Sequence, residues 1–133
     1  MDQSATTEPQ DSKKIIRVSA SDATTFAESV LKGNGVSPAN AAIIARCLVA
    51  ADLRGVDTHE INRIPSFMAR ILQGVLNAKA EPELHQVTLV VAQFDGHNGF
   101  GFVAAHLAIE IAKEFAIGMV SVKHCCVAGA ASN

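Results

Sequence analysis

Residues 51–67 read ADLRGVDTHEINRIPSF and join two segments in which apolar residues recur at helical spacing. Within this stretch His59 and Arg63 stand four positions apart, so they would share one face if the segment is helical. Arginine binds carboxylates through paired hydrogen bonds, and histidine exchanges a proton near neutral pH. The pair suits a small 2-oxo or 2-hydroxy acid, with Arg63 on its carboxylate and His59 as proton donor to its carbonyl oxygen. Taken alone, His59 is more typical of an exposed histidine at the start of a helix.

The residues before this stretch predict a tail and two helices. Residues 1–14 are polar and aperiodic, which is typical of a disordered tail, and residues 15–18 predict a short edge strand. A first helix is expected over residues 22–32, ended by the Gly-Asn-Gly turn that follows. Ser37 and Pro38 open a second helix that runs to about residue 54 and is apolar on more than one face. It should therefore be buried on more than one side, with Cys47 as a core thiol.

The residues after Asp57 predict a third helix and then a small α/β unit. Asp57 and Glu60 resemble an N-terminal capping pair. Pro65 either kinks the third helix or confines its regular part to residues 65–73. Beyond it we expect a loop at residues 77–85, a strand at 87–94, a glycine-rich turn at 95–101, a fourth helix over 100–115 and a strand at 119–122. A strand, helix, strand order predicts a parallel pair of strands.

Composition excludes several classes of partner. The net charge of −2 and the pI near 6.2 give no basic field for nucleic acid. No apolar run approaches the roughly eighteen residues of a membrane helix, and the leader carries acids and no hydrophobic segment, which favours the cytoplasm. The three cysteines, two of them adjacent, do not form a disulfide framework and are expected to be reduced thiols.

Two further motifs carry weaker signals. The turn GHNGFG reads G-x-x-G-x-G, whereas a dinucleotide site reads G-x-G-x-x-G, so a tight turn is favoured over a phosphate cradle. The sequence His124-Cys125-Cys126 has no second ligand pair at zinc-like spacing, so we expect no metal site. His97 and His106 are expected at the surface.

The stretch ADLRGVDTHEINRIPSF resembles the motif ADLRG-x-[DE]-[ST]-H-G-x-x-R-x-P of the type-2 malate/L-lactate dehydrogenase family, which includes ureidoglycolate dehydrogenase and 2,3-diketogulonate reductase. The similarity extends to the entry of the second helix, to DGHNGFG and to GMVSVK. It implies a non-Rossmann oxidoreductase fold and a homodimer that transfers hydride between NAD or NADP and a small 2-hydroxy or 2-oxo acid. By this resemblance His59 is catalytic, while Arg63 and Thr58 bind the carboxylate substrate.

The sequence departs from the family pattern at three points. Glu60 replaces a glycine, which puts a carboxylate beside His59. Val127 stands where the family has a second active-site histidine, and a valine cannot donate a proton. The family's chains are more than twice as long, and their cofactor-binding segments align beyond Asn133, so the resemblance covers an N-terminal portion that lacks most of the nicotinamide site.

The fold class expected is α/β, or α+β, with a helical module followed by the start of a central sheet. The domains expected are a tail at residues 1–14, a helical module with the substrate motif at 15–76, and an incomplete α/β domain at 77–133. The alternative to an enzyme is a non-catalytic, truncated paralogue or interaction module that keeps only the helices and the dimer-forming surface. In either case exposed apolar faces of the strands that begin near Val87 and Met119 would favour association.

Overall fold

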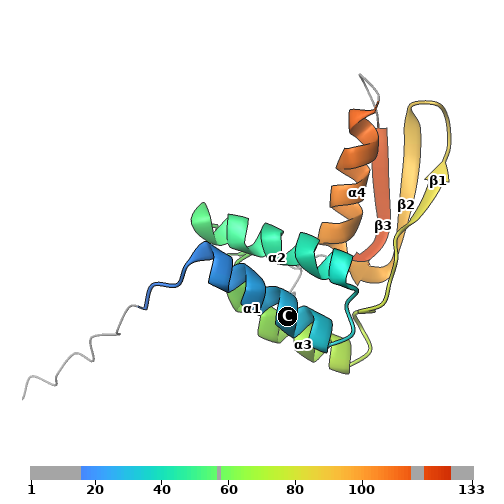
Figure 1. Ribbon diagram of the computed structural model, residues 1–133. Helices are drawn as coiled ribbons and strands as arrows, with labels where there is room; N and C mark the ends of the chain where they lie inside the picture. Colours follow the sequence, from blue (N-terminus) through green and yellow to red (C-terminus); the bar gives the residue numbers. More distant parts are fainter. Residues whose placement is uncertain (1–15, 57, 115–118, 127–133) are drawn as a thin grey trace, which may run out of the picture.

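A computed structural model describes residues 16–56, 58–114 and 119–126. Helices α1, α2 and α3 form one group, and helix α4 lies along a sheet of strands β1, β2 and β3 (Figure 1). The mixed α/β class is therefore as the sequence predicts. No helix among the described residues is both long and apolar enough to span a membrane.

The first two helices begin at serines. Helix α1 (Ala20–Gly33) begins after Ser19, whose hydroxyl accepts a hydrogen bond from the Asp22 amide at 3.0 Å. Helix α2 (Pro38–Leu53) begins after Ser37, whose hydroxyl accepts from the Asn40 amide, with proline in the first turn. Both helices were predicted, and their bounds differ from the prediction by one or two residues.

The predicted edge strand at residues 15–18 is wrong for its described part. Residues 16–19 form no strand, and Ile16 and Val18 are 74% and 65% exposed. Three apolar residues without a neighbouring strand bury too little surface to offset the entropy of ordering the backbone. The tail at residues 1–14 lies outside the described residues.

The third helical segment begins with a 3-10 turn, η1 (Ile61–Arg63), and continues as α3 (Ile64–Leu72) with Pro65 in its first turn. Of the two alternatives for Pro65, confinement of the regular helix is therefore the one that holds. Proline is tolerated there because its missing N–H would have no partner. The predicted capping pair of Asp57 and Glu60 falls partly outside the described residues, because Asp57 is not among them. Glu60 precedes η1 and accepts a hydrogen bond from the Asn62 side chain at 2.8 Å.

The sheet has the order β1-β2-β3, in which β1 (Glu83–Gln86) is antiparallel and β3 (Met119–Cys126) parallel to β2 (Val91–Phe100). The parallel pair was predicted, with helix α4 (Gly101–Lys113) between its strands in sequence. Strand β1 overlaps the end of the predicted loop at 77–85, and β3 extends past the predicted residues 119–122.

The predicted strand at 87–94 and turn at 95–101 are both displaced. Residues 87–90 form the β1–β2 hairpin turn, in which the Val87 and Thr88 amides donate to the Val91 carbonyl at 2.9 and 3.0 Å. Strand β2 then continues through DGHNGF with an irregular register between Asp95 and Gly99. His97 and Asn98 adopt positive φ angles of 48° and 59° there and form a bulge, after which the strand continues.

The core sits between the helical module and the junction of β2 with α4. Leu31, Ile44 and Leu48 are fully buried, and burial of such side chains contributes about 1.5–3 kcal/mol each. Phe67 of α3 packs edge-on against Phe100, with ring centroids 5.5 Å apart, and against Phe102 at 6.2 Å. These rings attach the segment that carries His59 to the start of α4.

Candidate active site

A pocket of about 380 Å³ opens where the 51–67 stretch meets α4 and β3. Its lining comes from three places in the sequence: His59, then Gly101, Phe102 and Ala105 of α4, then Val122 and Cys125 of β3. This size is within the range of small-molecule sites, which are mostly apolar with a few polar groups. His59 is the only imidazole among the described residues that line this pocket.

His59 is oriented by its neighbour in the sequence. The Thr58 hydroxyl and Nδ1 of His59 share a hydrogen bond of 2.7 Å, and the imidazole meets the Phe102 ring edge-on at a centroid distance of 6.4 Å. Since Nδ1 is engaged, Nε2 is the ring nitrogen left for a ligand. A hydroxyl both donates and accepts, so Thr58 can partner Nδ1 in either protonation state of the ring.

Arg63 does not share a helical face with His59, because residues 58–60 form a turn and Arg63 ends η1. The prediction from helical spacing is wrong in this respect. Arg63 is tied to the site another way: its Nε donates to the Thr58 carbonyl at 2.9 Å. Within the described ranges its terminal nitrogens make no hydrogen bond, so they keep the paired donors that a carboxylate accepts. Arg63 is not part of the pocket lining.

The other walls of this pocket include the N-terminal end of α4 and the thiol of Cys125. Helix α4 begins after Phe100 with no side-chain cap, and its first two residues, Gly101 and Phe102, line the pocket, so the positive end of the helix lies at the pocket wall. Burial above all, with Asp95 and Cys126 adding to it, raises the pKa of the Cys125 thiol. Cys125 is therefore in its protonated, weakly nucleophilic form at neutral pH.

Sequence reasoning found His59 and missed the five other lining residues. Phe102 and Ala105 stand three positions apart on one face of α4, and that spacing was the available signal. The sequence predicts Cys125 only as a reduced thiol outside a metal site, and the predicted strand at 119–122 ends before it. Among the residues that the structure describes, no group of His, Cys, Asp and Glu side chains is arranged to hold a metal ion. Val127 lies outside these residues.

A second cluster of charged side chains lies beside the bulge of β2, and none of its members lines the pocket. The Asp95 carboxylate accepts from the His97 amide at 3.0 Å and lies 3.1 Å from Nδ1 of His124 and 3.5 Å from Nζ of Lys123. The His97 amide first, and then the His124 side chain, lower the pKa of Asp95 to about 2. His97, predicted at the surface, is exposed and also lies 3.3 Å from Glu83.

Comparisons with known proteins show which proteins this chain resembles. The malate dehydrogenase of Pyrococcus abyssi is 32% identical over 116 residues, which are 84% of this chain and 32% of that protein. Hydroxycarboxylate dehydrogenase B of Escherichia coli O157:H7 is 33% identical and is matched over 72% of this chain and 28% of its own length. The solved structure of malate dehydrogenase from Pyrococcus horikoshii superposes with a TM-score of 0.77 at 33% identity, covering 86% of this chain and 34% of that one.

The chain thus spans about a third of the length of these relatives. The family model described as malate/L-lactate dehydrogenase matches residues 18–133, which include every residue of the pocket lining. By this match the chain belongs to the malate/L-lactate dehydrogenase family.

Proposed function

We propose that this chain supplies the proton-transfer part of an oxidoreductase site for small 2-hydroxy and 2-oxo acids, with His59 as the acid and base. The observation that carries the proposal is the position of His59: its imidazole lines the pocket while Thr58 holds Nδ1 at 2.7 Å. In the reducing direction a 2-oxo acid gains a hydride at its carbonyl carbon and a proton from His59 at its oxygen. The reverse yields the 2-oxo acid, and His59 takes up the proton.

The substrate carboxylate has two sources of attraction near His59. Arg63 has the terminal donors described above, and its Nε donates a hydrogen bond to the Thr58 carbonyl. This bond fixes Arg63 to the turn that carries Thr58 and His59. The uncapped first turn of α4 adds partial positive charge at the pocket wall. In a 2-oxo acid the carboxylate is one bond from the carbonyl, so one substrate would present its carboxylate to Arg63 and its carbonyl oxygen to His59.

The hydride carrier implied by the family is NAD or NADP, and the described residues fit only part of it. The apolar walls formed by Phe102, Ala105 and Val122 suit a flat ring such as nicotinamide. No lysine or arginine is among the residues that line this pocket, so the lining offers no cationic side chain for a pyrophosphate. When bound, the carrier would supply or accept the hydride. The residues described here would exclude water from one side of the ring and hold the proton on His59.

The names of the relatives support this substrate class. They include malate dehydrogenases, an L-sulfolactate dehydrogenase of Methanocaldococcus jannaschii that is 34% identical, and hydroxycarboxylate dehydrogenase B. Because this chain spans only about a third of such proteins, turnover by the chain itself is part of the proposal.

The test is an assay of the purified chain with NADH or NADPH and a panel of 2-oxo acids. We expect His59→Ala to lower the rate by at least about 100-fold, since general acid catalysis contributes about 10²–10⁴-fold. Thr58→Val should lower the rate and shift its pH profile, because Nδ1 loses its partner, whereas Thr58→Ser should keep both. Equal background rates in all four proteins would contradict the proposal.

A second candidate function, a non-catalytic interaction module, is favoured by exposed apolar side chains. Leu89, Met119 and Val87 are 85%, 65% and 63% exposed, at the end of the sheet away from the helical module. Clear turnover that depends on His59 would exclude this candidate. A chain that binds a partner through these residues without turnover would favour it.

A further inference from the structure

A second pocket, of about 450 Å³, lies between α2 and α4 and has a different chemistry from the first. Its lining combines small and apolar groups with three nitrogen-bearing side chains: Arg46, Cys47, Ala50, Ala51, Arg54, Val56 and His106. Cys47, predicted as a core thiol, is only partly buried because it borders this pocket. The pocket shares no lining residue with the one that holds His59.

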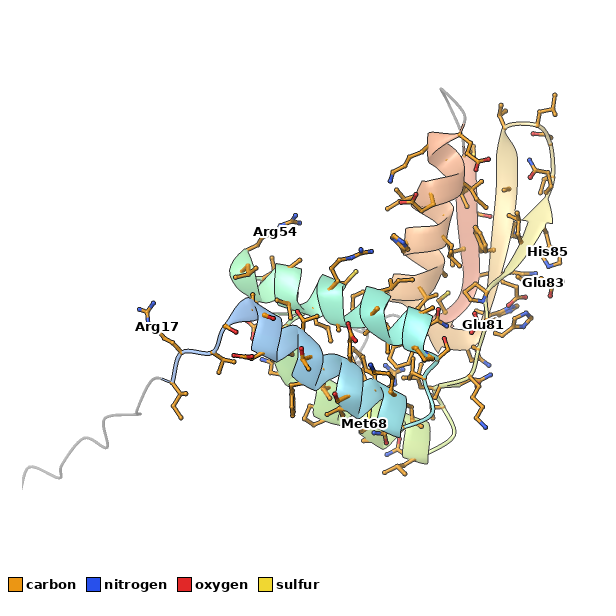
Figure 2. All side chains as sticks on the ribbon, viewed as in Figure 1. Arg17, Arg54, Met68, Glu81, Glu83 and His85 are labelled. Carbon is orange, nitrogen blue, oxygen red and sulfur yellow. The ribbon has the colours of Figure 1, made fainter. Side chains whose placement is uncertain are left out.

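The helix geometry explains why the two arginines face one space. Arg46 and Ala50 of α2 and Arg54, the residue that caps its C-terminal end, follow one another at i, i+4 and i+8, so they share a face about two turns long. Ala50 between them has a single methyl group and leaves the space between the guanidinium groups open. His106 of α4 closes the opposite side. Figure 2 shows Arg54 reaching outward from the end of α2.

Neither guanidinium group has a hydrogen bond or salt bridge in the part of the chain that the structure describes. Two acidic side chains on α2 and α4 have other partners. Glu110 interacts electrostatically with Arg46, but its carboxylate lies 2.6 Å from Nζ of Lys113, which lowers its pKa. Asp52 accepts a hydrogen bond from the Ile61 amide at 3.2 Å. Among the described residues that line the pocket, two are arginines and none is acidic.

The C-terminal end of α2 opposes an anion, since its carbonyl groups carry about half a negative charge. Two full guanidinium charges outweigh this. Arginine also presents its donors in a planar fork that matches the oxygens of phosphate, and a ring nitrogen of His106 adds a further polar group.

We propose that this pocket, defined by Arg46, Arg54 and His106, binds a phosphate group, either as free phosphate or as part of a phosphorylated small molecule. The site is separate from the proton-transfer role of His59, because the two pockets have no lining residue in common. It provides the cationic donors that the first pocket lacks.

Calorimetric titration of the full chain with inorganic phosphate and with AMP, at constant ionic strength, tests the proposal. We expect Arg54→Gln and Arg46→Gln each to weaken phosphate binding by about tenfold or more, since each removes charge-assisted hydrogen bonds. Arg17→Gln is the matched control: it removes the same charge from the exposed segment before α1 and should leave binding unchanged (Figure 2). Tighter binding of AMP than of phosphate would identify a phosphorylated small molecule as the class of ligand, and equal binding would identify free phosphate.

A variant that keeps both arginines separates a site from a general charge effect. Ala50→Glu would put a carboxylate between them and should abolish phosphate binding, while glutamate remains a good helix former. Far-UV circular dichroism and the melting temperature would verify that each variant folds. No phosphate binding by the unmodified chain, or an equal loss in Arg17→Gln and Arg54→Gln, would overturn the proposal.

Discussion

Gly96 of β2 lies against residues 124 and 125 of the neighbouring strand β3. A methyl group at this position would overlap Sγ of Cys125 and come within 3.0 Å of the His124 carbonyl oxygen. The absence of a side chain at Gly96 is therefore what allows the Cys125 thiol to turn inward, toward the first pocket. A single glycine thus shapes a wall that the spacing of charged residues does not reveal.

Gly96→Ala should lower the free energy of unfolding by about 1–3 kcal/mol, because the added methyl group overpacks this contact. Chemical denaturation measures the change. Gly33→Ala is the control, since a methyl group there meets nothing within 4 Å. Adding Cys125→Ala to Gly96→Ala should recover part of the loss. Similar losses for Gly33→Ala and Gly96→Ala would show that the packing at Gly96 is not as described.

At the scale of the element, the bulge of β2 is held by the Asp95 cluster. Its hydrogen bonds to the His97 amide and the His124 ring join two residues with φ of 48° and 49°, a region that costs non-glycine residues energy. His97 is on β2 and His124 is on β3, so Asp95 connects the two parallel strands. The ionised carboxylate is the form that makes these contacts.

Asp95 should make the sheet sensitive to acid. Its pKa in the folded chain is lowered from 3.8 to about 2, so the folded state favours the ionised form. The stability it contributes is fully present above pH 3.8 and is lost as the pH falls toward about 2. The melting temperatures of the unmodified chain and of Asp95→Asn should therefore differ most near neutral pH, and the difference should disappear as the pH falls from 3.8 to about 2.

His124→Gln provides the companion measurement for this cluster. It removes the second-largest cause of the shift, so the pKa of Asp95 should rise, and an NMR titration of the Asp95 carboxyl carbon would follow it. If the melting temperatures of the unmodified chain and of Asp95→Asn differ by the same amount from neutral pH down to about pH 2, the assigned role of Asp95 is contradicted.

At the scale of the whole molecule, one end of the sheet is unusually apolar. We call Val87, Leu89, Val90 and Met119 the apolar sheet end. The Met119 amide donates to the Val90 carbonyl at 2.9 Å, so the hairpin and the start of β3 form one surface. Exposed apolar residues that gather in one place mark association surfaces. This exposure was predicted from the sequence for the strands that begin near Val87 and Met119.

The chain should associate through the apolar sheet end, and a homodimer is the form we propose. Light scattering after size exclusion should give a mass that rises with concentration. Leu89→Lys combined with Met119→Lys should shift it toward the monomer, because each change replaces exposed apolar surface with charge. Leu72→Lys is the control, as Leu72 is 83% exposed on α3. A monomer at every concentration, or an equal effect of Leu72→Lys, would exclude this surface.

The sequence by itself determined the helical module, the parallel pair of strands and the family. The signals that made this possible depend only on neighbouring residues: Ser37 with Pro38, the helical spacing of Ile44 and Leu48, and the motif around His59. The cap and the buried face of α2 are present in the folded chain. The catalytic role predicted for His59 rested on its neighbours in the sequence and stays a prediction, while the structure places His59 in the lining of a pocket.

Only the tertiary structure decided how the pocket is built. The glycine-rich segment of β2 was predicted as a turn, but pairing with β1 and β3 supplies hydrogen bonds that local propensity does not count, and the segment is a bulged strand. That pairing carries β3 on to Cys125 and closes the wall opposite His59. In the same way Arg63 reaches the site through the Thr58 carbonyl and not through a shared helical face. Contacts between residues far apart in sequence have no local pattern, so they follow from packing alone.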